Sequence, residues 1–179
     1  LGNRQDTSDD RPFSGWWSLR GRNALHGAWH FYLDVYGFST LWKKPDSLVN
    51  PKAVYCAEPS CSTDVQIPYP VVLYRIYQKR WLSRYWQEKG MCCFVDLSVP
   101  PEWAALNMEG VPKGWQSYAT AANDNRLDEL AAHARIADQQ TMGRELRLLV
   151  YGGGKKTAAM CEENKWVHVR DARNEARNG

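Results

Sequence analysis

Two hydrophobic periods alternate along the chain. Short runs rich in Val, Tyr, Phe and Trp indicate strands, and longer stretches with apolar residues at helical spacing indicate helices. Helical stretches fill the intervals between strands, and the longest is VVLYRIYQKRWLSRYWQEKG (71–90). The strand-like runs are AWHFYLD (28–34), AVYCAE (53–58), MCCFVDL (91–97), GWQSYAT (114–120), ELRLLVYGGG (145–154) and KWVHVR (165–170).

Strands that alternate with helices are typical of βαβ units, whose crossovers join parallel strands. The pattern therefore predicts an α/β fold with about six mostly parallel strands alternating with helices, in a single domain. Because six strands are fewer than the eight of a closed barrel, we expect an open sheet or an incomplete barrel. We place this domain at 28–170, after an irregular N-terminal arm at 1–27 and before a C-terminal tail at 171–179.

Composition narrows the class of protein. Apolar residues make up 44% of the 179 residues, and nine Trp and nine Tyr argue against a disordered chain. The sequence has no run near 18 consecutive apolar residues, which argues against a membrane-spanning helix. Five cysteines, an odd number without metal-ligand spacing, predict reduced buried thiols and no metal site. A reducing cytoplasm is the simplest location.

The net charge of +3 conceals an uneven distribution. Residues 11–52 carry six basic and two acidic side chains, and residues 70–89 carry five basic and one acidic. Residues 101–140, in contrast, carry three basic and six acidic side chains. The basic segments are therefore the candidates for contact with a polyanion.

The long helical stretch also carries aromatic residues at helical spacing, namely Tyr74, Tyr77, Trp81 and Tyr85. Basic residues interleaved with aromatic ones suit phosphate neutralisation combined with base stacking. The alternative is that the aromatic stripe packs on the sheet while the basic residues face water. The predicted nucleic-acid contacts are Arg75, Lys79, Arg80, Arg84, Lys155 and Lys156.

Three carboxylates follow strand-like runs: Asp34, Glu58 and Asp96. Because the carboxyl ends of parallel strands meet at one edge of a sheet, these acids could form a catalytic centre or hold a divalent cation. They could equally be helix caps or turn residues. Whether the protein is an enzyme stays open, and so does whether it uses a cofactor.

A glycine turn, Gly152, Gly153 and Gly154, leads from the strand-like run at 145–154 into Lys155 and Lys156. The exposed N–H groups at such a helix start favour an anion. The spacing differs from that of a P-loop, so the sequence predicts an anion-binding turn or a plain glycine turn with solvated lysines.

The segments WHFYLDVYGFSTLWKKP, YPVVLYRIYQKRWLSRYWQEKG, EGVPKGWQSYAT and LLVYGGG resemble an uncharacterised family, a domain of unknown function encoded by phages, plasmids and other mobile elements. The resemblance covers roughly residues 28–152. Two acids of the family pattern are replaced, by Val35 and Ser60. The matching positions are Asp34, Tyr36, Phe38, Trp42, Pro59, Ser62, Tyr85, Trp86, Gly110, Pro112, Gly114, Tyr151 and Gly152.

The resemblance implies a mobile-element setting and an α/β fold, and no activity. The leading hypothesis is a protein that engages DNA or RNA in replication, recombination or control of the element. A metal- or phosphate-dependent enzyme with the strand-end carboxylates is the first alternative. The second is a factor that binds a host protein, in antidefence or regulation, through an aromatic patch that would include Trp16, Trp17, Trp81 and Trp115.

Overall fold

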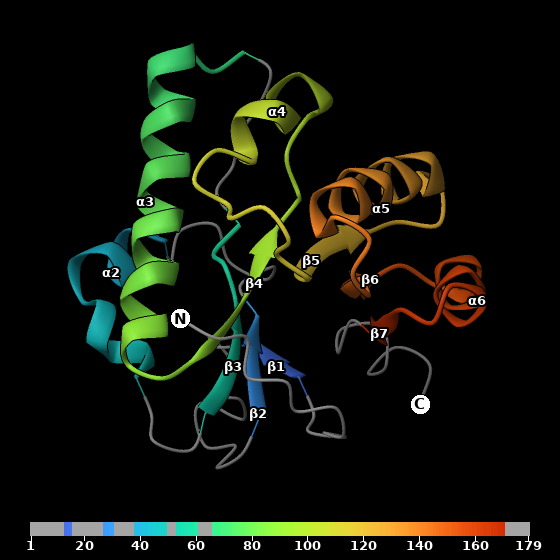
Figure 1. Cartoon of the computed structure of the whole chain (residues 1–179), viewed down its shortest axis with the longest axis horizontal. Helices are drawn as coiled ribbons and strands as arrows, with labels where there is room; N and C mark the ends of the chain where they lie inside the picture. The colour runs from blue at the N-terminus through green and yellow to red at the C-terminus, as the bar shows by residue number, and fades with distance from the viewer. Residues whose placement is uncertain (1–12, 16–26, 31–37, 50–52, 61–65, 171–179) are drawn as a thin grey trace. The chain divides into compact units, whose positions relative to one another are not determined.

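The computed structural model (Figure 1) describes residues 13–15, 27–30, 38–49, 53–60 and 66–170. The chain folds as two compact units, one of residues 1–61 and 74–93 and the other of residues 62–73 and 94–179. The helix α3 (Tyr69–Glu88) and the strand β4 (Cys92–Asp96) each run from one unit into the other. Within the described ranges, no helix is long and apolar enough to cross a membrane.

The first unit contains the parallel strands β1 (Phe13–Gly15), β2 (Gly27–His30) and β3 (Ala53–Ala57), each paired with the next along the chain. Its helices are α2 (Phe38–Lys43), the short 3-10 helix η2 (Pro45–Leu48) and most of α3. Leu41, Leu82, Trp86 and Met91 form its core, together with Cys56 and Cys93.

The second unit contains β5 (Ser117–Ala122), β6 (Arg147–Gly152) and β7 (Val167–Val169) beside the end of β4, again parallel and in chain order. Leu148 to Gly152 are all buried, as expected for an inner strand covered on both faces. Its helices are the short η3 (Pro101–Trp103) and α4 (Ala104–Asn107), then α5 (Leu127–Thr141) and α6 (Lys155–Glu163).

The predicted α/β class with parallel strands and alternating helices is confirmed. The described part contains seven strands instead of about six. The additional strand, β1, lies in the segment at 1–27 that we expected to be an irregular arm. Most of that segment, and the whole of the predicted C-terminal tail, lie outside the described residues. The strand β1 is three residues long, too short for a period-2 pattern to distinguish it from a loop.

Candidate nucleic-acid interface

The two sides of α3 differ in a way that the sequence alone left open. Val72, Ile76, Leu82 and Trp86 recur at helical spacing and are buried. The predicted aromatic stripe lies outside this buried set: Tyr74, Tyr77 and Trp81 expose 53%, 54% and 39% of their surfaces, and Tyr85 is half-buried. The aromatic stripe is therefore largely open to water, because smaller apolar residues and Trp86 already fill the buried side.

The rings of this stripe form a continuous row that includes Trp42 of α2. The centroids of Tyr74 and Tyr77 lie 6.3 Å apart with nearly parallel planes. Trp42 meets Tyr77 and Trp81 edge to face, at 6.3 and 5.3 Å. Trp81 and Tyr85 stack at 5.3 Å with an interplanar angle of 12°. We call Trp42, Tyr74, Tyr77, Trp81 and Tyr85 the aromatic row.

Hydrogen bonds fix one end of the aromatic row. The hydroxyl of Tyr85 donates to Oδ1 of Asp46 in η2. This hydrogen bond, followed by burial, raises the pKa of Tyr85 above its ordinary value. The indole Nε1 of the neighbouring Trp86 donates to the carbonyl oxygen of Pro45 at 3.0 Å. The chain segment after α2 is thus held against α3, which keeps Trp42 in contact with the rings of the helix.

Basic residues flank members of the aromatic row along the chain. Lys43 and Lys44 follow Trp42 directly and are exposed. The ammonium of Lys89 lies 5.3 Å from the centre of the Tyr85 ring, a cation–π distance. Arg84 is exposed and pairs with Glu88 at 3.3 Å on the same helix. Arg75, which was also predicted as a nucleic-acid contact, is half-buried.

Two other predicted contact residues lie inside the unit. Lys79 is fully buried. The guanidinium of Arg80 forms an ion pair with Glu58, whose side chain is 1% exposed, and Ser83 donates to Glu58 Oε1 at 2.9 Å. In this arrangement the charges of Lys79 and Arg80 are turned inward, so neither residue presents its charge beside the aromatic row.

The described tryptophans of the predicted protein-binding patch belong to different units. Trp81 belongs to the aromatic row of the first unit. Trp115 is half-buried in the second unit, where its Nε1 donates to the carbonyl oxygen of Ser117 at 2.8 Å. Trp16 and Trp17 lie outside the described residues.

The strand-end acids occupy separate surroundings. Glu58 is held by Arg80 and Ser83 in the first unit. Asp96 is buried in the second unit, where its Oδ1 accepts from the backbone N–H of Ser98 at 3.1 Å. Asp34 lies outside the described residues. Across the part of the chain that the structure describes, no group of three or more His, Cys, Asp or Glu side chains could hold a metal ion.

The predicted anion-binding turn already binds an anion of the chain itself. Asp124, two residues after β5, accepts from the backbone N–H groups of Gly154 at 2.7 Å, Thr157 at 3.0 Å and Lys156 at 3.3 Å. Its Oδ1 also accepts from the hydroxyl of Thr157 at 2.7 Å. These hydrogen bonds, that of Thr157 foremost, hold the pKa of Asp124 well below its usual range. Lys155 and Lys156 themselves are exposed.

The sequence analysis did not predict that Asp124 binds the glycine turn before α6, or that Trp42 joins the aromatic stripe of α3. Asp124 accepts hydrogen bonds from the start of a helix about 30 residues later in the chain. Neither hydrophobic periodicity nor local motif spacing can relate residues so far apart. Trp42 was visible as a matching position of the family resemblance, but its contact with Tyr77 and Trp81 joins two helices. The one signal in the sequence is that Asp124 follows the end of a predicted strand, a position from which an Asp can cap a helix.

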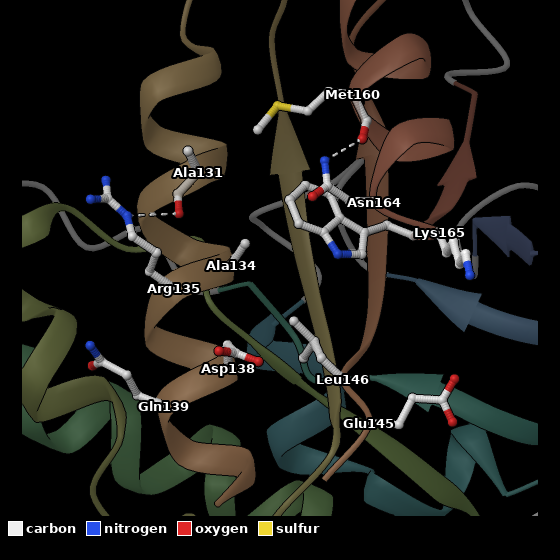
Figure 2. Close-up of a pocket in the computed structure, with 11 residues that line it drawn as sticks. Ala131, Ala134, Arg135, Asp138, Gln139, Glu145, Leu146, Met160, Asn164 and Lys165 are labelled. Carbon is white, nitrogen blue, oxygen red and sulfur yellow. Dashed lines mark hydrogen bonds between the residues drawn. The ribbon is translucent and has the colours of Figure 1, made fainter. Parts of the chain in front are cut away.

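A shallow groove of about 620 Å³ opens on the second unit between α5 and the end of α6 (Figure 2). Ala134, Leu146, Met160 and Trp166 form its apolar part. Its charged lining residues are of both signs, with Arg135 and Lys165 basic and Asp138 and Glu145 acidic (Figure 2). Charges of both signs around the groove give no single ligand chemistry.

Comparison with known proteins identifies the family to which the chain belongs. Residues 16–116 match the model of a domain of unknown function, DUF4417. This match both starts and ends earlier in the chain than the resemblance that we traced over 28–152. No solved structure matches the chain.

Two curated relatives are each called "Gene 1 protein". The one from Mycobacterium phage L5 is 33% identical over 131 residues, which are 69% of this chain and 52% of the relative. The one from Mycobacterium phage D29 is 28% identical over 139 residues, 70% of this chain and 48% of the relative. The chain spans about half the length of these relatives. The family match covers more than half of the chain, and the chain therefore belongs to the DUF4417 family of domains of unknown function.

Proposed function

We propose that this protein engages single-stranded nucleic acid through the aromatic row and the cations around it. The observation that carries the proposal is the exposure of Tyr74, Tyr77 and Trp81 in one row. Aromatic side chains that leave 39% to 54% of their surfaces open to water contribute less to core stability than fully buried ones do. Rows of exposed rings beside cations are typical of surfaces on which unpaired bases stack.

The chemistry of the row favours single strands over duplexes. Each base of a single strand has a free π-face, and stacking on a protein ring contributes about 1–3 kcal/mol per base. In a duplex the bases stack on one another and are closed to such rings. Trp81 and Tyr85 are already stacked together at 5.3 Å, so a base would extend an existing stack.

The surrounding cations supply the phosphate contacts. Lys43, Lys44, Arg84 and Lys89 are exposed, whereas Lys79 and Arg80 are turned inward. Four phosphate contacts on a single strand predict a slope of log affinity against log salt of about −3. The exposed carboxylates Asp46 and Glu88 lie among these cations and keep the expected affinity moderate.

The cellular role we propose is replication, recombination or control of a mobile element, in the cytoplasm of a bacterial host. The phage origin of two relatives supports this setting. Binding of a host protein through the same rings is the competing function, since Trp, Tyr and Arg are also frequent anchors of protein interfaces. The two differ in salt dependence and in response to a single-stranded oligonucleotide.

The test is fluorescence anisotropy of a labelled 20-nucleotide single strand, titrated with the protein at 50 and 200 mM salt. We expect Trp81→Ala to weaken binding by roughly 5- to 160-fold, because one stacking ring is lost. Trp81→Phe should retain most of the affinity. Val71→Ala, which trims an equally exposed apolar residue of the same helix outside the row, is the matched control.

A duplex of the same sequence should bind more weakly than the single strand. Equal affinity for both, no binding at 50 mM salt, or an equal response to Trp81→Ala and Val71→Ala would contradict the proposal. Circular dichroism of each variant establishes that α3 is retained.

A further inference from the structure

Two buried cysteines of the first unit lie in direct contact. Sγ of Cys56 in β3 and Sγ of Cys93 in β4 are 3.2 Å apart, and the two residues expose 0% and 2% of their surfaces. The thiol of Cys93 also donates to the backbone carbonyl of Ser83 in α3, at 3.4 Å. Both side chains belong to the core around Leu41, Leu82 and Trp86.

The sulfur atoms are already near bonding distance. A disulfide has an S–S bond of about 2.05 Å, so closing the remaining gap needs a movement of about 1 Å, within reach of small side-chain rotations. The two thiols come from strands 37 positions apart in the chain. Their contact is therefore a product of the fold and not of local spacing.

We propose that Cys56 and Cys93 are a site of oxidative modification, at which a small peroxide converts the thiol pair into a disulfide. In the first step a thiolate attacks the O–O bond of hydrogen peroxide, which leaves a sulfenic acid and hydroxide. The second thiol then attacks the sulfenic sulfur and releases water. In sum, two thiols and one peroxide give one disulfide and two water molecules.

The buried position of the two thiols restricts which oxidant can reach them and which cysteines can pair. Burial excludes bulky oxidants, and hydrogen peroxide is close to water in size. The hydrogen bond with Cys56, together with burial, holds the pKa of Cys93 above its usual value, so its thiol form predominates and attack on the peroxide draws on a minor thiolate population. Cys92, the chain neighbour of Cys93, points to the other side of the strand and is half-buried. Cys161 belongs to the core of the second unit.

The cross-link would close a loop that contains the whole of α3 and its share of the aromatic row. A loop of this length is restricted in the unfolded chain when it is closed, which stabilises the folded form. Oxidation is thus expected to secure the helix that carries the row without touching the row itself.

The experiment treats the full chain with stoichiometric and excess hydrogen peroxide and maps the peptides without reduction. The expected result is a linked peptide pair joining Cys56 to Cys93, two hydrogen atoms lighter than its parts. The midpoint of thermal unfolding should rise by roughly 5 °C or more. A phosphine reductant should reverse the rise.

Cys56→Ala and Cys93→Ala should each abolish the linked peptides and the rise in unfolding temperature. Cys161→Ala is the matched control, because it removes a buried cysteine of the other core and should leave the cross-link intact. Where a core variant fails to fold, the peptide map of the unsubstituted chain still decides. Predominant linkage through Cys61 or Cys92, or oxidation of Cys56 and Cys93 only to sulfinic and sulfonic acids, would overturn the proposal.

Discussion

The helix α3 and the turn before α6 both combine basic residues with groups that could bind a polyanion, aromatic rings in α3 and backbone N–H donors at the turn. The two regions differ in which of these groups are exposed and which already have a partner. In α3 the aromatic residues face water while Lys79 and Arg80 turn inward. At the α6 turn the lysines face water, but the backbone donors point at Asp124.

The difference lies in which groups already have a partner. The N–H groups of Gly154 and Thr157 are engaged by a carboxylate from the same unit, so a phosphate would have to displace it. Tyr74, Tyr77 and Trp81, in contrast, leave a large share of their surfaces open to water. A positively charged segment is thus a guide to a binding surface only after its own intramolecular contacts are known.

The largest expected effect tests whether Arg80 belongs to the core. Glu58→Gln removes the charge that pairs with Arg80 and leaves a largely buried guanidinium without its carboxylate. We expect the free energy of unfolding to fall by about 3 kcal/mol or more, measured by urea denaturation. Glu88→Gln, which removes the exposed partner of Arg84, should cost about 0.5 kcal/mol or less. Equal costs would place Arg80 among the surface cations.

The second prediction tests how closely the α6 turn is packed. Gly153 has φ of +72°, and a Cβ there would lie 2.5 Å from Cβ of Thr157. Gly143 has φ of +79°, and a Cβ there would meet nothing within 4 Å. Gly143→Ala should cost about 1–2 kcal/mol from backbone strain alone, and Gly153→Ala clearly more. Thermal unfolding measures both, and similar losses would show that the turn can relax.

The third prediction sets the two lysine pairs against each other. Lys43→Ala with Lys44→Ala removes the same charge as Lys155→Ala with Lys156→Ala. Only the first pair follows a ring of the aromatic row, so we expect it to reduce the salt slope of single-strand binding by about 1.4. The second pair should change the slope little. The reverse result in the anisotropy titration would move the interface to the α6 turn.

The smallest expected effect concerns the pH dependence of the α6 turn. The folded pKa of Asp124 is lowered, so its contribution to stability is complete above the ordinary Asp value of about 4 and is lost as pH falls below it. Asp124→Asn should therefore unfold at a lower temperature than the unsubstituted chain at pH 7, and the difference should shrink toward pH 3. A pH-independent difference would mean that packing, and not the carboxylate charge, holds the turn.

The sequence by itself determined the α/β class and the position of most elements, because strand and helix periods are local properties. It also located the aromatic stripe of α3, since residues at helical spacing share one side of a helix whatever surrounds it. The family resemblance followed from residues of the same segments and was confirmed by the family match.

Only the tertiary structure decided which side of α3 is buried, because that depends on the partners that the helix meets. Lys79 reads as a surface residue in the sequence, yet it is fully buried. Glu58 with Arg80, Asp124 with the α6 turn, and Cys56 with Cys93 join positions 22 to 37 residues apart. Such pairs form when chain crossovers bring elements together, and no short-range periodicity records them.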